Sequence, residues 1–382
     1  MQTDPRISRR VVLRGVGLAG AAALVGCGGT RDVAAPGPAT TRSGQGVSVR
    51  DQRGQRITLD VPARRLVTIP MPAAALLIAV DGSADHLVGM HPSSWTALHD
   101  GILGEFFPRA LAIPHDVASA DFAPNVESVV ALRPDVVVQW GDRGPGLTAP
   151  LENAGLKVVG LEYGTQEDLL TWISLFAALV GRPERAALIT DAIDGARQQE
   201  ARTTASVATG RPKVVYFNRF AGGLKVAGDA TYNDFSIRLV GAANPASGPS
   251  GAPGKGMLGV SLEQVLAWDP DVVLLGNFDD AVPEDVYRDP VWRRVSAVRE
   301  RRVYKVPLGG YRWDPPSHES PLMWRWLSMV AFPAQPAFDL RGEIDRYYSL
   351  YYGKTPTPAQ TDAVLRTAVN GASANYRRFD AG

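Results

Sequence analysis

The chain has 382 residues, which is enough for about two domains that each bury a core. Its 45% hydrophobic and 21% charged residues are typical of a soluble globular protein. The net charge is +1, but residues 1–26 hold four arginines and one aspartate, so the rest of the chain carries a net charge of −2. A chain without excess positive charge is poorly suited to a phosphate backbone, and we expect no nucleic-acid partner.

The first 46 residues predict a signal peptide, a lipid anchor and a tether. Residues 1–26 combine a twin-arginine pair with a Gly/Ala-rich apolar run, which is shorter than the roughly 20 residues of a transmembrane helix. Cys27 directly follows this run, as in bacterial lipoprotein signals, and is the predicted lipidation site. It is the only cysteine, which excludes an internal disulfide and a Cys-ligated metal. The lipidated Cys27 and a Gly/Pro/Thr/Ser-rich tether fill residues 27–46, so we expect an extracytoplasmic cell-membrane lipoprotein.

Residues 47–181 alternate predicted strands and helices, the pattern of an α/β lobe. In chain order we expect a hairpin at 47–59, strands at 66–69 and 86–90 with a helix at 73–80 between them, a loop at 91–95, a helix at 125–132, a strand at 136–139, a helical turn at 151–154 and a strand at 157–161. Thr165 and Asp168 form a predicted capping box for a helix at 166–180.

A long helix is predicted at 183–207, inside a linker segment 182–208. Its length of roughly 35 Å would make it a rigid strut between two lobes. The second lobe then fills residues 209–382. In chain order it contains predicted strands at 213–217, 271–275 and 302–306, and helices at 232–240, 261–268, 321–330, 340–352 and 358–370. The Gly-rich segment 248–259 is interpreted as a mobile surface loop, because its glycines do not fit the register of a phosphate-binding loop.

Two segments of the chain are nearly the same. Residues 125–141 read NVESVVALRPDVVVQWG and residues 261–277 read SLEQVLAWDPDVVLLGN, with seven of seventeen aligned positions identical. Each has a capped helix, a Pro-Asp turn and an apolar run of the kind found in buried parallel strands. The repeat therefore predicts two α/β lobes of similar local architecture, with a cleft between them.

Ligands of open α/β sheets bind beyond the carboxyl ends of the strands, so the loop residues at these ends are candidates for ligand binding. In the first lobe these are Met71, His91, Trp95, Trp140, Arg143 and Tyr163, and in the second Asn218, Arg219, Phe220, Tyr232, Asn277 and Phe278. The strongest candidate is the loop 309–318, with Tyr311, Arg312 and Trp313. Arginine recognises anionic groups and aromatic rings offer flat apolar faces, so these residues suggest an anionic, partly aromatic ligand.

Catalytic and cofactor motifs are missing from the sequence. It has no nucleophile elbow and no zinc-protease helix, and its one G-x-G-x-x-G match lies in the signal segment without a preceding strand. The five histidines show no metal-ligand spacing. We therefore expect a protein that is not an enzyme, and we assign neither a cofactor nor a metal ligand.

The two repeated segments and DPVWRRVSAVRERRVYKVP at 289–307 resemble substrate-binding proteins of ABC importers for iron complexes and cobalamin. The resemblance implies two Rossmann-like lobes with parallel-rich sheets joined by one long helix. It also implies an ABC permease and its ATPase as partners, with Glu127 and Glu263 docking on the permease. The expected cargo is a small-molecule iron complex, foremost a ferric siderophore. Haem, cobalamin, a molybdate-like oxyanion and Zn²⁺ or Mn²⁺ remain alternatives, as does, less favoured, an extracytoplasmic α/β enzyme.

Overall fold

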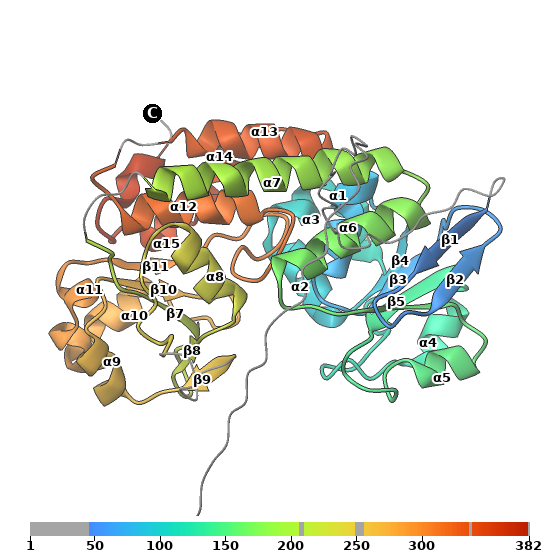
Figure 1. The fold of residues 1–382 in the computed structure, drawn as a ribbon, viewed down its shortest axis with the longest axis horizontal. Helices are drawn as coiled ribbons and strands as arrows, with labels where there is room; N and C mark the ends of the chain where they lie inside the picture. Colours follow the sequence, from blue (N-terminus) through green and yellow to red (C-terminus); the bar gives the residue numbers. More distant parts are fainter. Residues whose placement is uncertain (1–45, 206–209, 249–255, 336–337, 381–382) are drawn as a thin grey trace, which may run out of the picture. The chain divides into compact units, whose positions relative to one another are not determined.

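The computed structural model describes residues 46–205, 210–248, 256–335 and 338–380. The predicted signal peptide, Cys27 and almost the whole tether lie outside the described residues. The first lobe contains a four-stranded sheet of order β4-β3-β5-β6, in which all neighbouring strands are parallel (Figure 1). Its strands are β3 (Leu66–Thr68), β4 (Leu87–Met90), β5 (Val136–Trp140) and β6 (Val158–Leu161). The predicted hairpin is also present, as antiparallel β1 (Val47–Arg50) and β2 (Arg56–Leu59).

The second lobe contains a five-stranded sheet of order β11-β10-β7-β8-β9. Its parallel half consists of β7 (Val214–Arg219), β10 (Val272–Leu275) and β11 (Val303–Lys305). Two short antiparallel strands, β8 (Lys225–Ala227) and β9 (Met257–Gly259), complete it. Neither was predicted, and the end of the segment interpreted as a surface loop is strand β9, while residues 249–255 lie outside the described part. Strands of three residues carry too little periodicity to be recognised in a sequence.

The repeated segments fold alike, as helix α4 (Val126–Ala131) with β5 and helix α9 (Leu262–Trp268) with β10. Arg133 and Asp269 occupy corresponding positions and both have a left-handed backbone, with φ of 45° and 44°. Asp135 and Asp271 then accept backbone N–H bonds from the start of the adjacent strand, at Arg64 and Arg65 in one lobe and Lys213 in the other. The shared Pro-Asp turn thus ties each central strand to its neighbour, and the α/β architecture of two similar lobes is confirmed.

The helices follow the predictions except in five places. The observed helices of the first lobe and the linker are α1 (Ala73–Asp81), α2 (Pro92–Asp100), α3 (Ile102–Phe106), α5 (Ala149–Asn153), α6 (Gln166–Leu179) and α7 (Pro183–Ala205). Those of the second lobe are α8 (Tyr232–Leu239), α10 (Pro283–Arg288), α11 (Ser296–Arg299), α12 (Ser320–Ala331), α13 (Leu340–Tyr352), α14 (Pro358–Leu365) and α15 (Thr367–Asn370). The expected loop at 91–95 is wrong, because Pro92 starts α2 and His91 caps it. The expected single closing helix is broken at Arg366, which has a left-handed backbone, and α3, α10 and α11 were not predicted.

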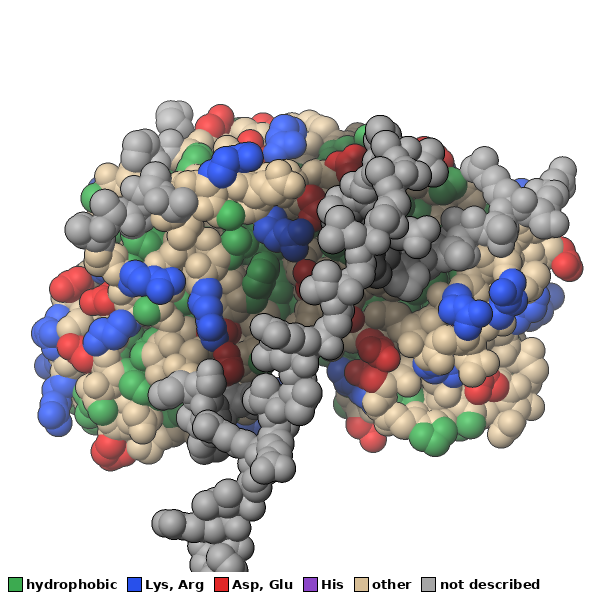
Figure 2. All heavy atoms as spheres, viewed as in Figure 1, with side chains coloured by type: hydrophobic (Ala, Val, Ile, Leu, Met, Phe, Trp, Pro, Cys, Tyr) green, Lys and Arg blue, Asp and Glu red, His purple; other side chains and the backbone are tan. Residues whose placement is uncertain are grey.

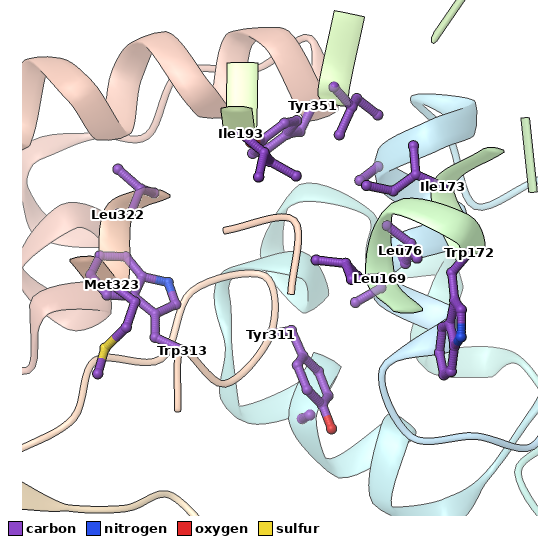
Figure 3. Close-up of a cluster of buried hydrophobic side chains, with 14 of the residues drawn as sticks. Leu76, Leu169, Trp172, Ile173, Ile193, Tyr311, Trp313, Leu322, Met323 and Tyr351 are labelled. Carbon is purple, nitrogen blue, oxygen red and sulfur yellow. The ribbon is translucent and has the colours of Figure 1, made fainter. Parts of the chain in front are cut away.

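One buried apolar cluster extends through both lobes. It includes every apolar residue of α1, the inner faces of α6, α7 and α13, and most of the apolar side chains of α12. Figure 3 shows Leu76 and Trp172 from the first lobe in the same cluster as Trp313 and Leu322 from the second. Helix α7 contacts α1 and α6 on one side and α8 and α12 on the other, and the buried ion pair Glu200–Arg325 (2.5 Å) joins it to α12. The lobes therefore share a core as well as a connecting helix.

Arg185 of α7 fastens three helices at one point. Its guanidinium donates to the carbonyls of Ala79 (2.7 Å) and Val80 (3.1 Å) near the end of α1. It also donates to those of Leu350 (2.8 Å) and Tyr351 (3.2 Å) near the end of α13. The last carbonyls of a helix have no partner within the helix and carry partial negative charge, so a single cation satisfies two helix ends.

We expect Arg185→Met to lower the free energy of unfolding by about 3 kcal/mol, because four carbonyls lose a charged donor. Urea unfolding followed by circular dichroism measures the change. The matched control is Arg288→Met, whose side chain is 72% exposed, and should stay within about 0.5 kcal/mol of the parent. If Arg185→Met lowers the free energy of unfolding no more than Arg288→Met does, the bonds of Arg185 to the helix ends do not stabilise the fold.

Candidate ligand-binding site

An aromatic cluster lies at the carboxyl ends of the first lobe's strands. The ring of Phe122 stacks on His91 (4.7 Å between centroids) and meets Trp140 edge-on (5.6 Å), and Trp140 lies 5.9 Å from Tyr163. The guanidinium of Arg143 lies 3.9 Å above the Trp140 ring and 5.0 Å from Phe122. Arg143 is exposed, and burial of the indole leaves the Trp140 Nε1 without a hydrogen-bond partner. The structure thus brings three sequence candidates, Trp140, Arg143 and Tyr163, to one place.

Other first-lobe candidates serve the fold. His91 is buried: its Nδ1 accepts the N–H of Ser93 at the start of α2, and its Nε2 lies 3.0 Å from the Ser119 carbonyl. Burial lowers the pKa of His91, so the neutral ring is a helix cap with both nitrogens engaged. Met71 is half-buried, and its carbonyl accepts the hydroxyl of Ser94.

Trp95 is held between two imidazoles. Its ring stacks on His99 (5.0 Å) and on His115 (4.8 Å), and its indole N–H donates to the Leu111 carbonyl. These contacts fix the ring on α2.

The loop 309–318 is anchored by Glu319, a residue that sequence reasoning missed. The carboxylate is fully buried and accepts the Gly310 N–H (2.9 Å), the Trp313 indole N–H (2.6 Å) and the Tyr352 hydroxyl (2.7 Å). A Cβ atom at Gly310 would overlap the Tyr352 hydroxyl, which explains a glycine at this position. Trp313 is therefore part of the anchor and not a ligand-facing ring.

The tip of this loop lies between the lobes. Tyr311 is buried between the two halves of the cluster in Figure 3, whereas Arg312 is half-exposed. The Tyr311 phenol and the Arg312 guanidinium are near enough to interact electrostatically, yet neither the phenol oxygen nor Nη1 makes a hydrogen bond of ordinary geometry. Further along the loop, the Tyr163 hydroxyl donates to the Pro316 carbonyl (2.6 Å), a direct contact of the first lobe with the loop.

Asp314 is a second anchor that sequence reasoning missed. It is buried and accepts the Tyr216 hydroxyl (2.7 Å), the backbone N–H of Asn277 (2.8 Å) and the Asn277 amide (2.9 Å). The carboxylate thereby connects the loop to the ends of β7 and β10. A buried carboxylate cannot be distinguished from a surface one by residue type, so only its position in the fold reveals the role.

Two cavities contain residues of both lobes. The larger measures 590 Å³ and lies between the N-terminal ends of α6 and α8. Its lining residues are Gly164, Thr165, Gln166, Glu167, Asp229, Ala230, Thr231, Tyr232, Asp234, Phe235, Arg238 and Leu239. The candidate Tyr232 lies in it, with its hydroxyl donating to Ser320 (2.6 Å), and burial raises the pKa of this phenol to about 12. The smaller cavity measures 130 Å³, and the candidates Asn277 and Arg312 line it.

The remaining candidates lie at the ends of the second lobe's strands. Arg219 ends β7 and is exposed, and Asn218 and Phe220 flank it. Phe278 follows Asn277 and lies 5.0 Å from the Arg312 guanidinium. Both lobes therefore have arginines at the ends of their strands, Arg143 in the first lobe and Arg219 and Arg312 in the second.

Glu127 and Glu263 occupy matching exposed positions in the first turns of α4 and α9. Asn125 and Ser261 cap these helices by accepting the backbone N–H bonds of Ser128 and Gln264. Both helices lie on the side away from α7 in Figure 1. Hydrogen bonds from its own backbone N–H and from Ser261 lower the pKa of the Glu263 carboxyl.

The described residues contain no group of three His, Cys, Asp or Glu side chains placed to hold a metal ion. Among the same residues, no helix has the length and apolar character needed to cross a membrane. On the face drawn in Figure 2, the basic side chains lie interspersed with acidic ones and form no single patch in the part of the chain that is described.

Comparison with known proteins decides the family. Residues 77–308 match the family described as periplasmic binding protein. The chain belongs to this family. A periplasmic solute-binding protein from Veillonella parvula has a similar structure, with a TM-score of 0.78 and 30% sequence identity over 85% of this chain and 98% of that one.

Two curated relatives have named ligands. The molybdate-binding protein MolA of Haemophilus influenzae is 24% identical and covers 81% of this chain and 92% of its own. The Fe(3+) dicitrate-binding periplasmic protein FecB of Escherichia coli is 22% identical and covers 68% of this chain and 81% of its own. The family and these relatives are solute-binding proteins, not enzymes, and deliver small-molecule ligands to ABC transporters.

The Glu319 anchor predicts a pH dependence of stability. Burial raises the pKa of this carboxyl from 4.5 to about 7, even though the hydrogen bonds it accepts favour the charged form. Below pH 4.5 both the folded and the unfolded state hold the proton. Between pH 4.5 and 7 the unfolded state loses it first, so this group lowers the free energy of unfolding as pH rises, by about 3 kcal/mol in total.

We expect Glu319→Gln to remove this contribution, so that the difference in unfolding free energy between parent and variant changes between pH 5 and pH 7. Urea unfolding at both pH values measures it. Glu300→Gln makes the same chemical change at an exposed position and should leave the pH slope unchanged. Parallel pH profiles for parent and Glu319→Gln would show that Glu319 does not titrate in this range.

Proposed function

We propose that this periplasmic binding protein is anchored outside the cytoplasm by a lipid at Cys27. We further propose that it captures an iron complex, foremost a ferric siderophore, between its lobes for an ABC permease and its ATPase. The 590 Å³ cavity between α6 and α8 carries the proposal. Its size falls within the range of about 300–1,000 Å³ typical of small-molecule sites, and its lining comes from both lobes.

The side chains around the cleft support an anionic, partly aromatic cargo. Tyr232 and Phe235 give the larger cavity aromatic walls. Arg143, Arg219 and Arg312 stand outside this cavity, where the strands of both lobes end, and guanidinium groups bind carboxylate and other oxygen-rich anions by paired hydrogen bonds. Many iron chelates present such oxygens at their surface, and the likeness to FecB points to the same ligand class.

A bare oxyanion is the second candidate cargo. The likeness to MolA favours it, because that relative is named for molybdate and the similarity extends over 81% of this chain. An oxyanion needs few aromatic contacts. Binding of a ferric siderophore should therefore depend on Tyr232 and Phe235 more than binding of an oxyanion does.

A thermal-shift panel separates the candidates. We expect a ferric siderophore to raise the unfolding midpoint of the full chain, with about 2.7 kcal/mol of added stability at one hundred times its dissociation constant. The panel also contains haem, cobalamin, molybdate, Zn²⁺ and Mn²⁺. Tyr232→Ala should weaken the binding of a ferric siderophore, while the exposed control Arg288→Gln should not. A response to molybdate or to a free metal ion alone would replace iron as the cargo.

Glu127 and Glu263 are the proposed docking residues for the permease. We expect Glu127→Ala with Glu263→Ala to abolish uptake in cells while cargo affinity stays within about twofold, because both carboxylates are exposed and neither lines either cavity. Uptake assays and titration calorimetry measure the two effects. Glu105→Ala with Glu300→Ala removes the same charge from other exposed positions as a control. A parallel loss of affinity would assign the pair to the binding site or the fold instead.

A further inference from the structure

The sheet of the second lobe has an open edge at β9. This strand pairs with β8 on one side, and no described strand pairs with its other side. Its three residues, Met257, Leu258 and Gly259, come shortly before helix α9, which carries Glu263. In Figure 1 both β9 and α9 lie on the side away from α7. The fold thus places an open strand edge beside a proposed docking residue.

The hydrogen bonds between β8 and β9 show which backbone groups face outward. Val260 donates its N–H to the Leu224 carbonyl (3.0 Å), and the Gly256 carbonyl accepts the N–H of the residue that follows β8 (2.9 Å). In an antiparallel pair, residues bonded to the partner strand alternate with residues whose N–H and C=O point away from it. Met257 and Gly259 are the alternate residues, so their N–H and C=O groups face the open edge.

Both outward-facing residues are accessible. Met257 is 44% exposed, which few large apolar residues are in the described part of the chain. Gly259 is exposed, and a Cβ atom at this position would meet no atom within 4 Å. Leu258 points to the other face, where it packs against the second lobe's core. Another polypeptide could therefore lie along the edge and cover the flexible methionine side chain.

The chain before the matching helix α4 is closed on itself instead. Ser119 donates its N–H to the Ala123 carbonyl (2.9 Å), and Ala118 forms a β-bridge with Pro124. The backbone there pairs within its own turn. The two repeated units therefore differ just before their docking helices, with a closed turn in the first lobe and an open strand in the second.

Two exposed charges flank the open edge. Glu263 lies four residues after Gly259, in the first turn of α9, and Lys225 lies opposite Gly259 in the ladder. When a strand is added to a sheet edge, main-chain hydrogen bonds supply affinity and side chains supply specificity. The edge fits an extended segment with an apolar side chain for Met257 and a cation for Glu263. The permease is the partner proposed for Glu263, so the same partner can supply this segment.

We propose that an extended segment of the ABC permease adds to the open edge of β9 as a further strand when this protein docks. The segment exchanges main-chain hydrogen bonds with Met257 and Gly259 and covers the Met257 side chain. This inference rests on the proposed function, because it takes the permease as the partner. It makes the lobes unequal in docking, since the second lobe offers a strand edge as well as the charge of Glu263.

The test measures binding of the full chain to the permease and its ATPase in lipid nanodiscs, with empty nanodiscs as reference. We expect the amides of Met257 and Gly259 to exchange with deuterium about tenfold more slowly in the complex, because hydrogen-bonded amides exchange only on opening. Gly259→Pro removes an outward N–H and blocks an added strand, so it should weaken binding about tenfold or more. Gly259→Ala, the matched control, keeps that N–H and should stay within about twofold.

The outcomes separate this inference from the proposed function. Circular dichroism shows whether Gly259→Pro folds, and the exchange measurement on the parent does not need that variant. Unchanged exchange of both amides in the complex, or equal dissociation constants for the parent and Gly259→Pro, would overturn strand addition and leave docking by Glu127 and Glu263 standing. If the parent does not bind the permease at all, the proposed function fails and this inference with it. Amide exchange that slows with protein concentration in the absence of permease would assign the edge to a second copy of this chain and overturn the permease as its partner.

Discussion

The lobes of this protein are held by a common apolar core. Helix α1 is buried at all nine positions, which is possible only because α6, α7 and α13 cover it. Arg185 then caps the ends of α1 and α13 from α7, so a helix of each lobe is fixed to the connecting helix at one point. Moving one lobe against the other would expose this core to water, at about 25 cal/mol for each Å² of apolar surface. Large hinge motions are therefore costly, and we expect a ligand to be recognised by small rearrangements of side chains and loops.

The same core supports the loop that reaches between the lobes. Glu319 stands at the start of α12 and accepts hydrogen bonds from Gly310 and Trp313, which flank the loop tip. The hydroxyl of Tyr352 in α13 donates a third hydrogen bond to the same carboxylate. These hydrogen bonds fix the loop to the helices behind it. Rigid placement lowers the entropy lost on binding, which suits a protein whose work is to hold a ligand and to release it to a transporter.

Most of the local structure follows from the sequence. Local interactions between residues a few positions apart form the repeated Pro-Asp turns, the N-caps at Asn125 and Ser261 and the apolar strands. These features can therefore be predicted from the sequence. Within the candidate site, Trp140, Arg143 and Tyr163 do lie together. His91, Trp95 and Trp313 instead support a helix cap, a ring stack and a loop anchor. A residue type suited to a ligand is equally suited to a buried hydrogen bond, and the sequence does not distinguish the two uses.

The sequence by itself determined two α/β lobes, the long helix between them, the repeated helix–strand unit and the loops at the strand ends. These features rest on periodicity, capping and turn chemistry, which act over short stretches of chain. Only the tertiary structure decided that Glu319 and Asp314 are buried anchors, and that α6 and α8 line the larger cavity. Burial and the lining of a cavity depend on distances between residues far apart in the sequence, and folding alone sets those distances.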